Sequence, residues 1–139
     1  MSELKQIEVV AAVIVEDDKL LATQRGYGDF KGKWEFLGGK IEQGETHEEA
    51  LVREIKEELN ADIEVLMFLT KVEHDYEKFH LTMHTYVCSL KDKIEMVKHG
   101  DNEFEHDNMV WLDEKHLDDV DWLPADIKVI NAYKKLALK

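Results

Sequence analysis

Residues 39–61 read G-K-I-E-Q-G-E-T-H-E-E-A-L-V-R-E-I-K-E-E-L-N-A and contain seven glutamates. Like charges three or four residues apart on a helix repel each other by a few tenths of a kcal/mol per pair, so a helix here needs a cation to hold the glutamates together. The acidic positions are Glu42, Glu45, Glu48, Glu49, Glu54, Glu57 and Glu58.

A helix over about residues 47–59 is predicted from its ends and its period. Thr46 followed three residues later by Glu49 is a capping box, which marks the start of a helix. Asn60 is the non-glycine residue that best tolerates the left-handed conformation of a helix C-cap. The helical period places one apolar stripe toward the core, made of Val52, Ile55 and Leu59.

Three glutamates of this helix share one edge. At about 100° per residue, Glu54, Glu57 and Glu58 fall within an arc of roughly 100° beside the apolar stripe. Carboxylate oxygens grouped in this way suit Mg²⁺ or Mn²⁺, which commonly bind through a few carboxylates together with substrate phosphates. We therefore expect a divalent metal site with Mg²⁺ as the cofactor, Mn²⁺ being the alternative. An acidic solvated helix without metal is the other interpretation.

The spacing of these residues resembles the Nudix box, G-x5-E-x7-R-E-U-x-E-E-x-G-U, in which U is a bulky aliphatic residue. Asn60 and Ala61 depart from it, standing where the family usually has glycine and an aliphatic residue. Since Asn tolerates the cap conformation and Ala61 only trims a core contact, both departures should be nearly neutral. The matching positions are Gly39, Glu45, Arg53, Glu54, Ile55, Glu57 and Glu58.

Composition limits the partners and the compartment. The chain has 139 residues, 44% of them hydrophobic, which predicts a single domain over residues 1–139, and the resemblance implies that this is a Nudix domain. Its formal net charge of −13 argues against binding a nucleic-acid polymer or an anionic membrane. Cys88 is the single cysteine, and no apolar run is long enough to span a bilayer, so we expect a cytoplasmic protein. Monomer and homodimer both stay open.

Hydrophobic period and turn residues predict a mixed α/β chain. A turn is expected at Gly38-Gly39, after a short strand, and the resemblance to Nudix proteins implies an α/β/α sandwich with a mixed β-sheet. Strands are predicted over residues 7–15, 20–24, 34–36, 63–73, 79–90 and 109–112, and a final helix over 124–136.

The resemblance also implies an activity, the cleavage of a nucleoside diphosphate linked to another group. It implies that Glu54, Glu57 and Glu58 bind metal, that Glu54 also orients or deprotonates water, and that the Gly38 carbonyl is a further ligand. Arg53 would pair with a neighbouring carboxylate and so hold the catalytic edge of the helix in position. Glu105, six residues before Trp111, lies where MutT-type members have an added metal ligand; a solvated acidic loop is the alternative.

Substrate contacts are implied on both sides of the box. Arg25 and Lys40 are candidate phosphate ligands, although each could be an ordinary exposed cation, and Phe36 and Gly39 belong to the same substrate-binding segment. Asp126 corresponds to a residue that meets the base in such proteins. A carboxylate accepts hydrogen bonds from an exocyclic amine such as cytosine N4, whereas the alternative is a first-turn Asp that complements the helix dipole.

The flanking segments look like MutT-type nucleoside triphosphate pyrophosphohydrolases, and especially their CTP-hydrolysing branch. This implies release of a nucleoside monophosphate and pyrophosphate from (d)CTP or a modified pyrimidine nucleotide. Hydrolysis of 8-oxo-dGTP or of another nucleoside diphosphate derivative is the alternative within enzymes. A Nudix-fold regulator without turnover is the alternative from another class, although intact Glu54, Glu57 and Glu58 argue against it.

Several residues with chemical potential are predicted to be structural. His80 and His84 share one strand face, but two histidines without a third matching ligand are more often packing or surface residues. Cys88 is expected to be a small packing residue, and Trp34 and Trp122 are expected to belong to the core.

Overall fold

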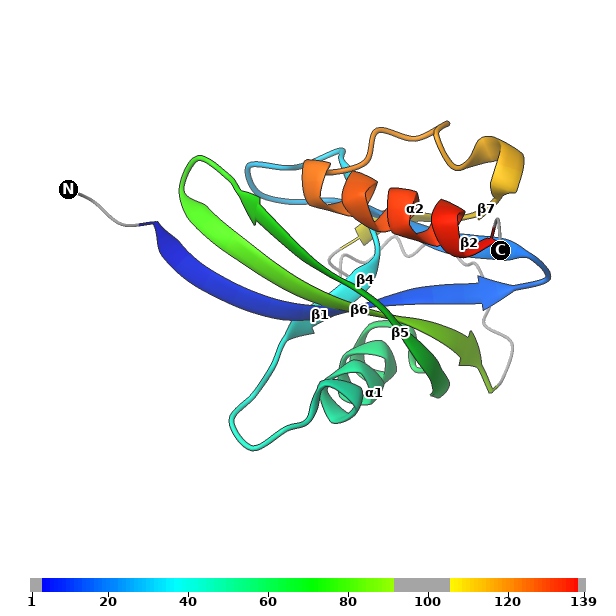
Figure 1. Cartoon of the computed structure of the whole chain (residues 1–139), viewed down its shortest axis with the longest axis horizontal. Helices are drawn as coiled ribbons and strands as arrows, with labels where there is room; N and C mark the ends of the chain where they lie inside the picture. The colour runs from blue at the N-terminus through cyan, green and yellow to red at the C-terminus, as the bar shows by residue number, and fades with distance from the viewer. Residues whose placement is uncertain (1–3, 92–105, 138–139) are drawn as a thin grey trace.

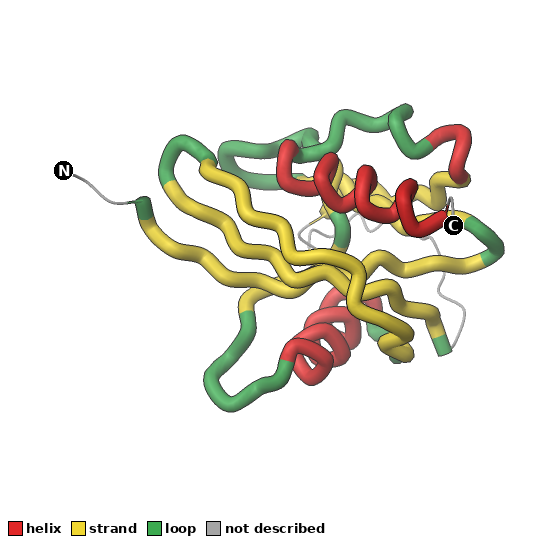
Figure 2. Tube along the Cα trace, viewed as in Figure 1, coloured by secondary structure: helices red, strands yellow, loops and turns green. Residues whose placement is uncertain are grey.

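The structure of the chain, a computed structural model, describes residues 4–91 and 106–137. They form a mixed sheet with one helix on each face, as Figure 1 shows, and Figure 2 shows how strands dominate the chain. The predicted α/β sandwich is confirmed. The elements are β1 Lys5–Glu16, β2 Lys19–Arg25, β3 Trp34–Glu35, β4 Leu37–Lys40, α1 His47–Leu59, β5 Ile63–Asp75, β6 Phe79–Leu90, β7 His106–Asp113, the 3₁₀ helix η1 Glu114–His116 and α2 Pro124–Ala137.

Strand β1 lies at the centre and is buried on both faces. It runs parallel to β6 over ten residue pairs, from Lys5 opposite Phe79 to Ile14 opposite Cys88. Successive side chains of a strand point to opposite faces. The hydrophobic core has two clusters, one beneath each helix. Val13 packs in the cluster with residues of α2, and Ile14 packs in the cluster with residues of α1. This double burial explains why the first strand is an almost continuous apolar run.

A tight hairpin connects β1 to β2. Asp17 and Asp18 both have positive φ, 51° and 63°, which is the backbone that a two-residue hairpin turn requires. Strand β2 then pairs with β3 and β7, so the strand order is β3-β2-β1-β6-β5, with β4 paired to β1 and β7 to β2. The predicted charged turn and both of its strands are confirmed.

The expected turn at Gly38-Gly39 is wrong. Both glycines lie inside β4, where Gly38 pairs with Ala11 and Gly39 pairs with Val10. A Cβ at Gly38 would collide with the backbone of β1, at the carbonyl oxygen of Val10. Gly38 therefore permits a close approach of two backbones, and the chain does not reverse at these glycines.

The buried side of α1 also differs from the prediction. Ala50, Leu51 and Ile55 are its buried residues, whereas Val52 is 40% exposed. Glu54 follows Ala50 by four residues and therefore lies in the same row of side chains, one turn farther along. Glu54 thus extends the buried side of the helix, whereas Glu57 is exposed.

The ends of α1 agree with the sequence. The Thr46 side chain accepts a hydrogen bond from the Glu49 amide, and the Glu49 side chain accepts one from the Thr46 amide. Asn60 caps the other end in the left-handed conformation with φ 52°. Among residues 4–91 and 106–137, no helix has both the length and the apolar character that crossing a bilayer requires.

Candidate metal and nucleotide site

Arg53 is the cation that holds the acidic segment together. Its Nε and Nη2 donate to the two carboxylate oxygens of Glu45 at 2.6 and 2.9 Å. Its Nη1 donates to Glu54 at 2.9 Å, and Nη2 also donates to the carbonyl of Lys40 at 3.0 Å. One guanidinium therefore joins β4, the loop before α1 and α1 itself. The fork of donors suits this task better than a point charge does.

Arg53 and Glu45 each stabilise the charged form of the other. The hydrogen bonds from Arg53 hold the pKa of Glu45 below its ordinary value, and Glu45 in turn raises the pKa of Arg53. Both groups therefore stay ionised throughout the physiological range. The pairing expected for Arg53 is present.

The side chain of Glu54 is much less exposed than that of Glu57, another of the predicted metal ligands. Its side chain is 16% exposed, compared with 59% for Glu57. Burial raises the pKa of Glu54, and the nearby Arg53 opposes that rise. The carboxylate also packs so closely against β4 that a Cβ at Gly39 would collide with it.

A cavity of about 520 Å³ lies next to these glutamates. Its lining comes from α1, β1, β2, β4, β6 and α2. It therefore includes residues of both helices, which lie on opposite faces of the sheet in Figure 1. Arg53 supports the cavity through Glu54 without lining it. The predicted site residues that line it are Arg25, Phe36, Gly38, Gly39, Lys40, Glu54, Glu57, Glu58 and Asp126.

The donor set of the cavity fits a hard divalent cation. Glu54, Glu57 and Glu58 bring three carboxylates to one wall, and Gly38 and Gly39 bring backbone without side chains. Oxygen ligands of this kind are what Mg²⁺ and Mn²⁺ prefer. Glu105, the further predicted ligand, lies outside the described residues.

Asp126 lies in the first turn of α2 and is almost completely buried, at 4% exposure. Its Oδ1 accepts a hydrogen bond from the Phe36 amide at 3.0 Å. Burial raises the pKa of Asp126 to about 8, so the carboxyl group is mostly neutral at pH 7. A neutral carboxyl group offers one O–H donor as well as an acceptor, whereas the ionised carboxylate expected from the sequence would only accept.

Arg25 is paired within the cavity. Its Nε and Nη2 donate to the two carboxylate oxygens of Glu35 at 2.8 and 2.7 Å. The side chains are 25% and 13% exposed. Two donors of Arg25 are therefore already used, and Glu35 is part of the site, a residue that the motif did not identify.

Aromatic side chains form another wall that the motif did not predict. The ring of Tyr76 lies 5.1 Å from Phe30 and 5.0 Å from Phe79, measured between centroids, and all three residues line the cavity. The Tyr76 hydroxyl accepts a hydrogen bond from the Ala125 amide at 3.0 Å. The sequence did contain an indication of this wall. Phe79, Leu81 and Met83 are apolar residues at every second position of β6, and residues two apart share one face of a strand.

Trp122 is a core residue, as predicted, whereas Trp34 is only partly buried. Trp122 is 5% exposed and stacks on Phe36 at 4.7 Å, and Trp34 packs against the same core cluster. Cys88 is completely buried, and burial raises the pKa of its thiol to about 12, so it is an inert packing residue.

Comparisons with known proteins agree with this geometry. Residues 5–133 match the model of the NUDIX domain. The chain is 36% identical to the CTP pyrophosphohydrolase of Escherichia coli over 135 residues, which cover 96% of this chain and 95% of that protein. It is 28% identical to the 8-oxo-dGTP diphosphatase of the same organism, covering 96% of this chain and all of that protein, 100%.

Solved structures support the same assignment. The solution structure of the E. coli ORF135 protein has a TM-score of 0.77 and 32% identity, and covers 96% of this chain and 92% of that one. A MutT NUDIX hydrolase from Burkholderia pseudomallei has a TM-score of 0.79 at 24% identity, over 92% of this chain and 98% of that one, which shows a common fold. This chain therefore belongs to the Nudix family of hydrolases, which act on the diphosphate bonds of nucleotides.

Proposed function

We propose that the chain is a Mg²⁺-dependent pyrophosphohydrolase that converts CTP or dCTP to the monophosphate and pyrophosphate. The observation that carries this proposal is a single cavity that combines the carboxylates of α1 with the buried carboxyl group of Asp126 and an aromatic wall. The carboxylates of α1 suit a metal-bound triphosphate, and Asp126 together with the aromatic wall suits a nucleobase. The likeness to a CTP pyrophosphohydrolase over almost the whole chain supports the choice of base.

In this proposal Glu54, Glu57, Glu58 and Glu105, with the Gly38 carbonyl, provide the oxygen ligands. Bound Mg²⁺ supplies charge neutralisation on the phosphates and a lowered pKa for water. Glu54 orients the attacking water and accepts its proton, because Arg53 holds this carboxylate in a fixed position. Proton transfer to a positioned carboxylate typically contributes about 10²- to 10⁴-fold to the rate.

Lys40 is proposed to contact the departing pyrophosphate, since it lies on the cavity beside Gly39. Arg25 is proposed to contribute to substrate binding as a pair with Glu35, to which it already donates twice. Phe36 is proposed to support the base, because its amide fixes Asp126 and its ring stacks on Trp122.

Asp126 is proposed to read the base. In its neutral form it can donate to N3 of cytosine and accept from N4, which matches the edge of that base. The second candidate is an oxidised purine nucleotide, favoured by the relatives named as 8-oxo-dGTP diphosphatases. We propose the cytoplasm, where nucleoside triphosphates are found, as the place of action.

The decisive experiment is a panel of CTP, dCTP, UTP, dTTP and 8-oxo-dGTP with detection of released pyrophosphate, with and without Mg²⁺. The expected result is Mg²⁺-dependent turnover with kcat/KM highest for a cytosine nucleotide. A preference for 8-oxo-dGTP would contradict the proposed cytosine substrate and support an oxidised purine nucleotide instead. Binding of nucleotides without turnover of any of them would support a regulatory module instead.

A further inference from the structure

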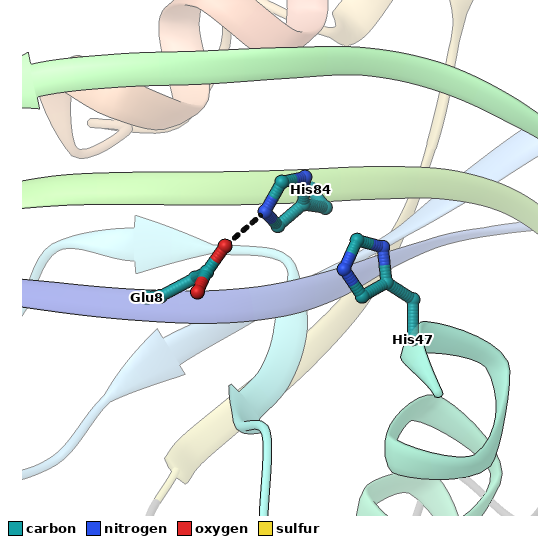
Figure 3. Close-up of side chains that lie close together, drawn as sticks. All are labelled: Glu8, His47 and His84. Carbon is teal, nitrogen blue, oxygen red and sulfur yellow. Dashed lines mark hydrogen bonds and ion pairs between the residues drawn. The ribbon is translucent and has the colours of Figure 1, made fainter. Parts of the chain in front are cut away.

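Three side chains outside the cavity form a second cluster of metal-binding type. Glu8 comes from β1, His84 from β6 and His47 from the first position of α1. One ligand atom from each lies within 4.8 Å of the others. Figure 3 shows the two rings and the carboxylate pointing toward one another.

The parallel pairing of β1 with β6 brings two of these residues together. Glu8 pairs with Thr82, and His84 follows Thr82 by two residues, so Glu8 and His84 share one face of the sheet. Glu8 Oε2 lies 2.6 Å from Nε2 of His84. Val10 lies on the same face and packs against the buried residues of α1. Helix α1 therefore covers this face, and its first residue, His47, lies close to Glu8 and His84.

We propose that Glu8, His47 and His84 bind a divalent transition-metal ion, with Zn²⁺ as the ion of choice. Two imidazole nitrogens and one carboxylate are a recognised three-ligand set for zinc, in which water takes the fourth position. Mg²⁺ prefers oxygen ligands, so the same set disfavours the ion expected in the cavity.

The dimensions of the cluster are compatible with one ion. Zinc lies about 2.0 to 2.2 Å from each ligand, so two ligand atoms on a tetrahedral ion are about 3.4 Å apart. The three ligand atoms lie within 4.8 Å of one another, so rotations of the side chains would bring them onto one ion. The hydrogen bond between Glu8 and His84 would open to admit the ion, and Glu8 can move because its side chain is 58% exposed.

A second contact orients His47 for this role. Its Nδ1 lies 2.9 Å from the hydroxyl group of Tyr86. When Nδ1 carries the proton and donates it to that hydroxyl, Nε2 keeps its lone pair for a metal.

The neighbouring His80 has carboxylate partners too, but its geometry is different. Its Nδ1 contacts Asp75, and its Nε2 lies 3.5 Å from Glu73. The two carboxylates therefore bind opposite edges of one ring and do not converge on a common point. His80 lies on the same strand face as His84 and is a matched control for it.

Binding at this cluster would link the start of α1 to the central strands. His47 is the first residue of the helix that carries Glu54 and Arg53, so an ion there would fasten this helix to β1 and β6. An ion that binds the folded state alone stabilises it by mass action. At a zinc concentration about 100-fold above the Kd, the melting temperature should rise by about 5 °C or more.

The test is Zn²⁺ binding to tag-free protein by equilibrium dialysis, with millimolar Mg²⁺ present to occupy the carboxylates of the cavity. One equivalent of Zn²⁺ per chain is expected for the wild type and for His80→Ala. Affinity should fall by at least about 10-fold in His84→Ala, and by about 10- to 100-fold in Tyr86→Phe, which loses only the hydroxyl that orients His47. X-ray absorption of the zinc-loaded wild type should show two imidazole ligands.

Glu8→Gln distinguishes a loss of metal binding from a folding defect. Glu8 is exposed and the substitution keeps the size of its side chain, so the variant should fold. It should also weaken Zn²⁺ binding, with an unaltered circular dichroism spectrum. Equal affinity in wild type, His84→Ala and Glu8→Gln would overturn the proposal, as would the absence of stoichiometric binding in the wild type. Glu8 and His84 would then be a simple ion pair. Nucleotide turnover is a separate measurement, so this outcome leaves the proposed hydrolysis untouched.

Discussion

The carboxylate of Glu54 lies against Gly39 with no room for a side chain at that position. Gly39→Ala should therefore displace Glu54 and leave the sheet intact, because the obstructing atoms are the end of a flexible side chain. Since small misplacements of reacting groups cost about 10²-fold, kcat should fall by about that factor. Steady-state kinetics and the melting temperature would check both parts.

Gly38→Ala is the matched comparison one residue away. Its Cβ would meet the backbone of Val10, which cannot rotate aside. Stability should therefore fall by at least about 2 kcal/mol in urea unfolding, which is the usual scale for overpacking. If Gly39→Ala proved to be the less stable of the two variants, the argument from their neighbours would be wrong.

Glu54→Gln keeps the size of the side chain but removes its basicity and one anionic ligand. We expect kcat to fall by at least about 10²-fold, and chelation by EDTA to abolish the activity of the wild type until Mg²⁺ or Mn²⁺ is restored. Glu48→Gln, on an exposed position of the same helix, should retain activity. Turnover that persists in excess EDTA would contradict a metal-dependent mechanism.

Asp126 predicts a specific dependence of stability on pH. Its pKa is raised from 3.8 to about 8 in the folded protein. The folded state therefore holds a proton that the unfolded chain releases, so this contribution is complete below about pH 4 and is lost as pH rises toward 8. Between these limits the free energy of unfolding should fall by up to about 1.4 kcal/mol per pH unit.

Asp126→Asn isolates this effect, because Asn does not titrate and still offers an oxygen to the Phe36 amide. The unfolding free energy of the variant minus that of the wild type should increase from about pH 4 to about pH 8 and then level off. Urea titrations at several pH values measure it. A difference independent of pH would mean that Asp126 is already ionised in the folded protein.

Asp126→Ala tests selection of the base. Loss of a specific contact to a base edge should reduce discrimination between CTP and UTP by about 1 to 3 kcal/mol in kcat/KM. Turnover of poor substrates should survive, since the metal ligands are unchanged. An unaltered preference in a folded variant would mean that Asp126 only stabilises α2. Glu35 would then be the next candidate for base selection.

The features that sequence predicted well depend on local chemistry. The capping box at Thr46, the left-handed cap at Asn60 and the two-aspartate turn all form within a few residues, so their types and spacing determine them. The acidic edge of α1 was found for the same reason. Its buried side was misjudged at Val52, because the packing of β1 and β4 selects Leu51 instead.

The features that sequence missed depend on partners far along the chain. Arg25 meets Glu35 only because β2 pairs with β3, and Asp126 is buried because its carboxyl group faces Phe36, 90 residues away. The contacts of His84 with Glu8 and His47 could not be predicted either, because those two residues come from other elements. No spacing rule joins residues that a parallel strand pairing brings together.

The central position of β1 also has a consequence for how the chain is made. This strand is synthesised before its parallel partner β6, which follows only after α1 and β5. Until then an apolar strand lacks one hydrogen-bonding neighbour and is prone to pair with other chains. Such distant pairing slows folding. The nascent protein should therefore depend on chaperones until Leu90 has emerged.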